Sequence, residues 1–537
     1  MKKFATPLLR RNRMRALLLV APLLLVGQNC TSLTEVPSDA LTPTNAFKSD
    51  AEVLAGVAAV YANLRDVEFV GYETLNELTT DAMIVPTRGN DWYDNGRWLE
   101  IHRQTWTANS GSALDDMNGA WNSLFSGVAK ANLMIDVIQK AGGAEAPRTL
   151  AELRTLRAWY YYMLQDMFGG VPLVTSTALK QNPRASRSEV FAFIEKELTE
   201  ARPALPDRWD ASGYGRVTKG AADAILASLY LNAGVFNKTS GVNATGYNSC
   251  NVPVAGGTNG CQAAIDAANR VINSGVYQLN PDWKQNFSTS NKSSPENIFV
   301  IVHVTDQALG GNFPMRTLHY NQLSTGWGSP WNGFATLAET YDQFAPTDDR
   351  RGMWLHGQAY SFETGQPVKD RSGNPLIFTD TIADAEKASE GEGVRFNKFP
   401  PLPSAPSGNG HPNDFPFFRL AEMYLIKAEA LNELGQTGAA MTELARIHNR
   451  HDPANPIAGG LTQQQMRDAI LKERLLEFTA EGKRRTDLVR HGKFLNKWSN
   501  TMLNGKQDKT NEPYRILFPI PATQIAANPL LQQNPGY

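Results

Sequence analysis

Along much of this chain, hydrophobic side chains recur at intervals of three and four residues, the spacing of one face of an α-helix. The clearest stripe lies between Thr149 and Gly169 and consists of Leu153, Leu156, Tyr160, Met163 and Met167. Gly169-Gly170 and Pro172 should end this helix, because glycine suits the backbone of a helix end and proline cannot continue it. The pattern predicts an amphipathic helix that packs against a neighbour.

Four Ser/Thr-x-x-Glu/Gln sequences mark expected helix starts, since the two side chains of such a capping box bond each other's backbone N–H groups. They are Ser49 to Glu52, Thr149 to Glu152, Ser186 to Glu189 and Thr462 to Gln465. Another helix is expected from Phe418 to Gly435, where small residues would let a partner helix approach closely. This segment resembles one helix of a tetratricopeptide pair, although no strict repeat runs through the chain. We therefore predict a mostly α-helical, irregular scaffold with tetratricopeptide-like helix pairs.

The composition of the sequence changes between residues 236 and 415, where Gly, Asn, Ser, Thr and Pro are frequent and aromatic residues are scattered among them. Strand-like runs are short there, as from Ile298 to Val304. We predict helical regions at 30–235 and 416–537 that flank a loop-rich variable region at 236–415, all within one compact domain. Long loops on a rigid scaffold are where binding specificity usually resides.

Residues 1–29 combine a basic start with a short apolar core at 16–26, which is typical of a secretory signal peptide. The apolar run is too short to span a bilayer. Cys30 follows at the distance expected of a lipoprotein, so we expect it to carry a lipid anchor. The residues before it, Gly27, Gln28 and Asn29, depart from the usual lipobox. An incidental cysteine beside an ordinary cleavage site is the alternative.

Composition and charge narrow the class of partner. The formal net charge is −1, from 52 Lys and Arg against 53 Asp and Glu, and no basic stripe suggests nucleic acid. The other two cysteines, Cys250 and Cys261, lie in or beside a Gly/Asn/Thr-rich stretch of an exported chain. They predict either a local disulfide or two free thiols.

Glu473, Glu477 and Glu481 are spaced four residues apart and could supply paired carboxylates for a glycosidase. Cationic neighbours argue against this, because they favour ionised carboxylates rather than a protonated general acid. We interpret the segment as a structural ion network and expect Glu481 to pair with Arg485 along one helix. The eight histidines show no metal-ligand spacing and are expected on the surface or in loops. We predict no enzyme, no catalytic residue, no cofactor and no metal site.

Two aromatic clusters in polar surroundings indicate sugar binding, since flat rings stack on pyranose faces while polar groups bond hydroxyls. The first includes Trp92, Tyr93 and Trp98; the second includes Tyr320, Trp327, Trp331 and Asn332. We predict these seven residues as ligand contacts. The alternative is that they pack the loops down or meet a partner protein.

Several segments, in order, resemble the SusD/RagB family. They are the stretch after Cys30 that ends in Tyr-x-x-Leu, Ala151 to Thr175 with its Phe-Gly-Gly-Val-Pro-Leu, Gly215 to Leu231, Arg419 to Gly435, Lys472 to Gly492, and Leu517 to Tyr537. The resemblance covers almost all of the expected mature chain.

The resemblance implies a cell-surface lipoprotein of the outer membrane that binds an oligosaccharide and delivers it to a SusC-like TonB-dependent transporter. In this family the ligand site is commonly an aromatic arc built from an N-terminal loop and loops of the variable middle. The two aromatic clusters match those regions in placement only. The alternative is a helical lid or scaffold for the transporter that binds peptide or another nutrient.

Overall fold

The structure is a computed structural model that describes residue 47 and residues 49–109, 111–238, 241–306, 309–323, 330–405, 408–496 and 512–537. The predicted signal peptide and Cys30 lie outside the described residues. Within these ranges no helix is both long enough and apolar enough to cross a lipid bilayer.

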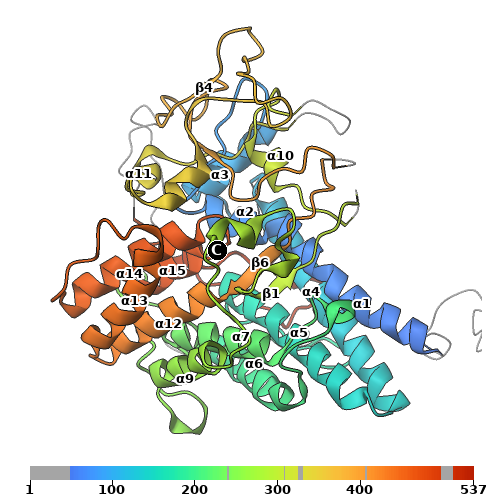
Figure 1. Cartoon of the computed structure of the whole chain (residues 1–537). Coiled ribbons are helices and arrows are strands. Elements are labelled where there is room, and N and C mark those ends of the chain that lie inside the picture. Colours follow the sequence, from blue (N-terminus) through green and yellow to red (C-terminus); the bar gives the residue numbers. More distant parts are fainter. Residues whose placement is uncertain are drawn as a thin grey trace, which may run out of the picture. The chain divides into compact units, whose positions relative to one another are not determined.

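The architecture is mostly helical, as predicted, with a few short strands (Figure 1). The α-helices are α1 (Asp50–Val67), α2 (Glu73–Leu78), α3 (Arg97–Arg103), α4 (Leu114–Ala141), α5 (Ala146–Phe168), α6 (Arg187–Ala201), α7 (Lys219–Leu231), α8 (Ala233–Phe236), α9 (Gly260–Ile272), α10 (Phe313–Thr317), α11 (Ala338–Tyr341), α12 (Leu420–Glu433), α13 (Thr437–His451), α14 (Gln463–Phe478), α15 (Arg484–Arg490) and α16 (Ala522–Ala527). The strands are β1 (Asn297–Ile301), β2 (Trp354–Leu355), β3 (Gly357–Gln358), β4 (Ile377–Phe378), β5 (Arg395–Phe396) and β6 (Phe415–Arg419).

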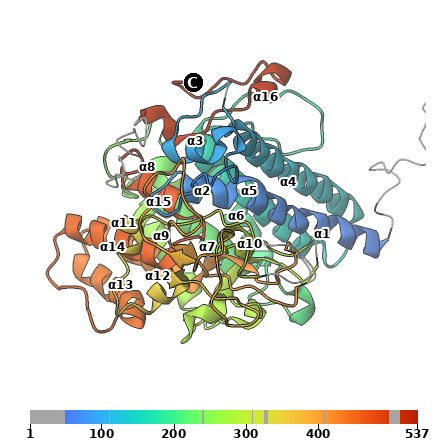
Figure 2. The same cartoon turned by 90° about the horizontal axis from the view of Figure 1, so that it is seen from above.

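The long helices pack on one another in a continuous series: α1, α4, α5, α6, α7, α9, α12, α13 and α14. Figure 2 shows α1, α4 and α5 lying side by side. One hydrophobic core runs through the series, and its members come from nearly the whole described chain. Helix α9 lies inside the stretch expected to be rich in loops, and it is needed to bridge α7 and α12.

Three of the four predicted capping boxes are confirmed, at Ser49, Ser186 and Thr462. The prediction at Thr149 is wrong, because α5 begins at Ala146 and has a proline in its first turn. Proline is favoured there since its missing N–H would have no helical partner. The carboxylate of Glu152 points elsewhere and binds Arg216, with a shortest N···O distance of 2.6 Å.

Strands β1 and β6 form an antiparallel pair in which Phe299 faces Phe418. They lie far apart in the sequence, and the residues between them make up much of the upper part of Figure 1, where α10, α11 and β4 lie together with α3. This excursion therefore leaves and rejoins the helical scaffold at one place.

The three predicted glutamates belong to a buried ion network. Arg419, between β6 and α12, contacts Glu477 (2.5 Å) and Glu481 (2.8 Å). Arg350 contacts Glu473 (2.7 Å) and Glu477 (2.8 Å) from the excursion. Burial alone would raise the pKa of Glu477, but Arg419, a nearby histidine and Arg350 outweigh it and hold that pKa well below its ordinary value. The structural interpretation of these glutamates is confirmed.

The expected pairing of Glu481 with Arg485 is wrong. Helix α14 ends at Phe478, so Glu481 lies beyond it and does not share a helix with Arg485. Arg485 instead contacts Asp166 of α5 at 3.2 Å. The cations that hold the glutamates come from distant segments, which spacing along one helix could not reveal.

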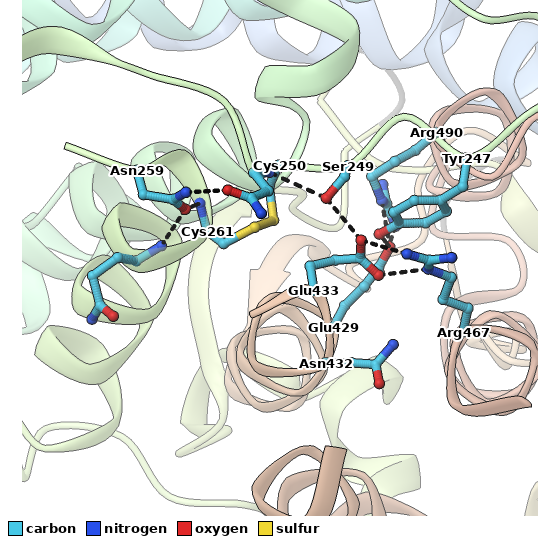
Figure 3. The surroundings of a disulfide bond; sticks show 12 residues. Tyr247, Ser249, Cys250, Asn259, Cys261, Glu429, Asn432, Glu433, Arg467 and Arg490 are labelled. Carbon is cyan, nitrogen blue, oxygen red and sulfur yellow. Dashed lines mark hydrogen bonds and ion pairs between the residues drawn. A yellow bond between two sulfur atoms is a disulfide. The ribbon is translucent and has the colours of Figure 1, made fainter. Parts of the chain in front are cut away.

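Cys250 and Cys261 form a disulfide that joins the segment before α9 to its first turn, with Cα atoms 4.9 Å apart (Figure 3). Both cysteines are fully buried. Beside the bond, the hydroxyl of Ser249 donates to Glu433 of α12 (2.7 Å), which also accepts from Arg467 of α14 (2.6 Å). The disulfide therefore sits where a loop is bonded to α9 and α12, and α12 in turn to α14.

The Glu477→Gln substitution should destabilise the fold by about 3 kcal/mol near neutral pH, because it leaves buried cations without their shared carboxylate. The pKa of Glu477 is depressed in the folded state, so its contribution is present above the unfolded value of 4.5 and is lost as pH falls. The cost, measured by chemical denaturation, should therefore shrink as pH falls below about 4.5.

Glu200→Gln is the matched control, since Glu200 forms an exposed pair with Arg154 at 2.6 Å. Its loss should change stability far less than the loss of Glu477, because an exposed ion pair contributes little to stability. An equal cost for Glu477→Gln at neutral and acidic pH would contradict the ion-network account.

Replacing both Cys250 and Cys261 by alanine should lower the free energy of unfolding by up to about 3 kcal/mol, because the disulfide restricts the unfolded chain. Thermal unfolding of the parent and the variant, each with and without reductant, measures this. Reductant should lower the midpoint of the parent only. A variant that unfolds at the parent's oxidised midpoint would show that the bond adds no stability.

Candidate functional site

The loop of residues 91–98, which carries the first aromatic cluster, has an unusual backbone. Trp92, Asp94 and Asn95 have positive φ angles of 61°, 38° and 55°. Residues other than glycine rarely adopt this backbone conformation, which costs roughly 1 kcal/mol or more per residue. The indole N–H of Trp98 donates to Asp94 (2.6 Å) and helps to fix the shape.

The two predicted aromatic clusters meet in the structure. The ring of Trp92 lies 5.0 Å from that of Trp98, 6.4 Å from that of Trp331 and 5.9 Å from that of Phe334, between centroids. The Trp92 Nε1 also donates to the carbonyl of Trp331 (2.5 Å), 239 residues away in the sequence. Gly333 leaves room for this contact, because a Cβ there would lie 2.4 Å from the Trp92 ring.

The rings differ in how much surface they offer. Tyr93 is 56% exposed and Trp331 is 36% exposed, so both present ring surface to solvent. Trp92 is half-buried between them and the core, whereas Trp98 is buried. Trp327 lies outside the described residues. We call the surface formed by Trp92, Tyr93 and Trp331 the aromatic platform.

The segment that carries Trp331 is anchored to α10. The backbone N–H of Trp331 donates to the carbonyl of Met315 (2.6 Å), and that of Phe334 donates to the carbonyl of Arg316 (2.8 Å). Arg316 in turn forms a buried ion pair with Glu73 of α2. A chain of bonds thus connects the platform to the helical scaffold.

Asn332 is buried and is held by two arginines. Its backbone, at a φ of 52°, gives a carbonyl that accepts from Arg88 Nε (3.0 Å). Its side-chain oxygen accepts from Nε (3.1 Å) and Nη2 (2.9 Å) of Arg395. The side chain is fully engaged by the protein, so we expect it to position the neighbouring Trp331 rather than to contact a ligand.

Both arginines are unusual because they are buried among carbonyl oxygens. Arg88 also donates to the carbonyls of Ser389 and Glu392, and Arg395 to those of residues in the same 389–393 turn. Within the described part of the chain, neither guanidinium lies within ion-pair distance of a carboxylate. Burial lowers the pKa of Arg88 to about 10 and, together with the charge of Arg88, lowers that of Arg395.

The rim of the platform is a network around Arg371. Arg371 bonds Asp91 (2.8 Å) and Glu390, and its guanidinium lies 4.4 Å over the Tyr320 ring. The Tyr320 hydroxyl donates to Asp91 (2.7 Å), and a ring nitrogen of His319 lies 2.9 Å from Glu390. One face of Tyr320 is therefore covered by the guanidinium. Burial raises the pKa of Glu390, but hydrogen bonds from Arg371 and His319 outweigh it, and the net shift is downward.

A pocket of about 550 Å³ adjoins the platform. Its lining includes Tyr93, Asn95, Arg103, Glu386 and Lys387. Arg103 and Glu386 form an ion pair at 3.0 Å. The pocket combines polar and charged side chains with the apolar surface of Tyr93 and Leu99, a mixture that suits a sugar with its hydroxyl groups and its C–H face.

The histidines follow the sequence prediction of surface or loop positions only in part, since His303, His319, His356, His411 and His491 lie outside helices but most histidines are buried. His102, His303, His319, His411, His451 and His491 are buried, mostly against carboxylates or backbone carbonyls. Among the described residues, no three His, Cys, Asp or Glu side chains are placed to hold a metal ion.

Sequence reasoning missed the residues that hold the platform together: Arg88, Arg371, Arg395 and Phe334. The three arginines belong to no periodic pattern or motif in the sequence. Phe334 follows the second cluster closely and could have been included, since it sits three residues after Trp331.

Comparisons with known proteins agree with this architecture. Residues 267–537 match the family model described as the SusD family, and residues 38–231 match one described as starch-binding, associating with outer membrane. The chain belongs to the SusD/RagB family, which confirms the resemblance seen in the sequence.

Individual relatives span most of the chain. The starch-binding protein SusD of Bacteroides thetaiotaomicron is 25% identical over 518 residues, 86% of this chain and 84% of that protein. A laminarin-binding SusD-like protein is similar in structure, with a TM-score of 0.69, 24% identity, and coverage of 91% of this chain and 100% of its own. Surface glycan-binding protein A from Bacteroides thetaiotaomicron, in complex with laminarihexaose, gives a TM-score of 0.68 at 20% identity over 90% and 99%. These two structures establish a shared fold.

The Asn332→Gly substitution should loosen the platform, because glycine keeps the left-handed backbone while removing the oxygen that Arg395 bonds. We expect a loss of about 1–3 kcal/mol in stability and faster hydrogen exchange at the Trp331 and Phe334 amides. Asn332→Asp is the control, since it keeps the side-chain acceptor for Arg395 and should exchange nearly as slowly as the parent. Unchanged exchange in Asn332→Gly would rule out the positioning role.

Proposed function

We propose that this chain is a non-enzymatic surface receptor that captures an oligosaccharide and delivers it to a SusC-like TonB-dependent transporter. In this proposal the receptor is held on the outer membrane by a lipid on Cys30. The observation that carries the ligand class is the aromatic platform, where Trp92 and the exposed Trp331, from two distant loops, are held with their ring centroids 6.4 Å apart.

The platform has the chemistry that a sugar requires. A pyranose presents an apolar face of C–H groups, which stacks on an aromatic ring, and an edge of hydroxyl groups, which needs polar partners. Trp331 and Tyr93 supply exposed ring surface. Asn95 and the charged groups of the adjoining 550 Å³ pocket supply donors and acceptors. The strained loop is already in shape, so little ordering is left for the binding step.

Family membership supports the same ligand class. Two of the relatives carry names that refer to starch and laminarin, and one was solved with laminarihexaose. The model matched by residues 38–231 is described as associating with outer membrane, in keeping with the proposed location. The transporter partnership rests on the family alone.

The test is binding of a soluble form that starts just after Cys30 to a panel of polysaccharides, by affinity electrophoresis and then calorimetry. Trp331→Ala should weaken binding of a hit by roughly 10- to 100-fold, because a central tryptophan contact is worth about 2 kcal/mol or more. Tyr93→Ala should weaken it in the same direction.

Tyr424→Ala is the matched control, since Tyr424 is a half-buried ring on α12. It should leave the affinity unchanged. Sugar binding that survives Trp331→Ala at full strength would remove the platform from the ligand site, and binding of a peptide in place of any sugar would favour the alternative nutrient.

A further inference from the structure

The charged groups around the aromatic platform restrict which sugars it can take. Acidic sugars carry carboxylate or sulfate groups, which proteins recognise chiefly with arginine because its planar fork forms two parallel hydrogen bonds. An anion brought against the platform would lose hydration and would need such a partner. An acidic sugar could therefore bind well only if an arginine near the platform were free to bond it.

Two arginines are withdrawn into the protein. Arg88 and Arg395 are 2% and 0% exposed, and their donors reach Asn332 and the carbonyls of the 389–393 turn. Using them for a ligand would require the loops that carry Trp331 to come apart. Their role is confined to positioning.

The more exposed arginines are already paired with carboxylates. Arg97 binds Asp116 through Nε (2.7 Å) and a second donor. Arg103 binds Glu386 at 3.0 Å. Arg371, although its side chain is 50% exposed, bonds both Asp91 and Glu390. Each of these three arginines is therefore already paired with a carboxylate of the protein itself.

The loop that carries Trp331 adds no further charged group. Residues 319–334, which contain Trp327 and Trp331, include no lysine, arginine, aspartate or glutamate. Asp94, in the strained loop beside Trp92, is exposed and would repel an anion. Lys387 is exposed in the adjoining pocket, but Glu100 and Glu386 line the same pocket. A lysine ammonium is also a hydrated point charge that matches a carboxylate less closely than a guanidinium.

We infer that the platform selects uncharged oligosaccharides and rejects uronic-acid and sulfated glycans, and that Asp91 and Glu390 set this specificity by occupying Arg371. This inference rests on the proposed function. An acidic glycan would be repelled by exposed carboxylates such as Asp94 and would find no unpaired arginine to bond it. Binding sites commonly exclude a competitor of similar shape in this way.

The experiment compares neutral and acidic oligomers of equal length on the soluble form. The neutral set is α-1,4-glucan, β-1,3-glucan, xylan and mannan hexasaccharides, and the acidic set is oligogalacturonate, oligoalginate and a sulfated β-1,3-glucan. Calorimetry is run at about 0.05 M and about 0.5 M NaCl. At least one neutral oligomer should bind about tenfold or more tightly than every acidic one, with an affinity that salt does not change.

A double variant, Asp91→Asn with Glu390→Gln, tests the residues that set the specificity. It keeps the shapes of both side chains but releases Arg371, so it should gain affinity for an acidic oligomer, and that gain should fall at high salt. Adding Arg371→Gln should abolish the gain. Unfolding midpoints and circular dichroism check that each variant is folded.

The outcomes separate the two proposals. Tight, salt-sensitive binding of an acidic oligomer by the parent, lost in Trp331→Ala, would overturn the selection for neutral sugars and leave the glycan receptor standing. No binding of either set, or binding indifferent to Trp331→Ala, would overturn the proposed site and this inference with it. A folded double variant without any gain would overturn the role of Asp91 and Glu390.

Discussion

The buried charges around Arg419 and Glu477 are the constraint on which the rest of the structure depends. Arg419 stands where β6 becomes α12, and it also bonds Glu296, just before β1 (2.9 Å). Glu477 lies near the end of α14 and is bonded from α13, β6 and the excursion at once. Buried ions are costly unless every partner is present, so each of these segments must arrive for any one of them to be stable. The network therefore fixes the relative positions of scaffold and excursion.

From that fixed base, the platform is reached through a short series of strong contacts. Arg316 of α10 forms an ion pair with Glu73 of α2, and backbone carbonyls of α10 accept hydrogen bonds from the Trp331 segment. Arg88 and Arg395 then join the three loops that surround Asn332. Loops are usually the most mobile parts of a fold, but here the polar groups beneath the rings are used by the protein itself. Rigid rings on a rigid base are well suited to repeated capture of a stiff sugar chain.

Local features of the fold were readable from the sequence, whereas long-range ones were not. The capping boxes at Ser49, Ser186 and Thr462 act through neighbouring residues, and they predicted helix starts correctly. The prediction at Thr149 was wrong because a proline upstream favours an earlier helix start, which the capping-box pattern does not detect. The Glu473–Glu477–Glu481 series was understood as ionic, but its arginine and lysine partners come from segments over 50 residues away, such as Arg419. For the site, ring-rich loops were visible, whereas the coverage of Tyr320 by Arg371 and the burial of Asn332 depend on tertiary contacts.

The single crossing at β1 and β6 has a consequence for how this chain can change over time. The residues between these strands enter and leave through one antiparallel pair, but Arg350, Lys398 and Arg316 also tie them to the scaffold. A replacement excursion of different length and composition must therefore match these contacts as well as the junction. Recombination or laboratory grafting between β1 and β6 would exchange the half of the platform that carries Trp331, while the loop that carries Trp92 stays behind. A change of ligand thus requires matched changes in two separate parts of the sequence.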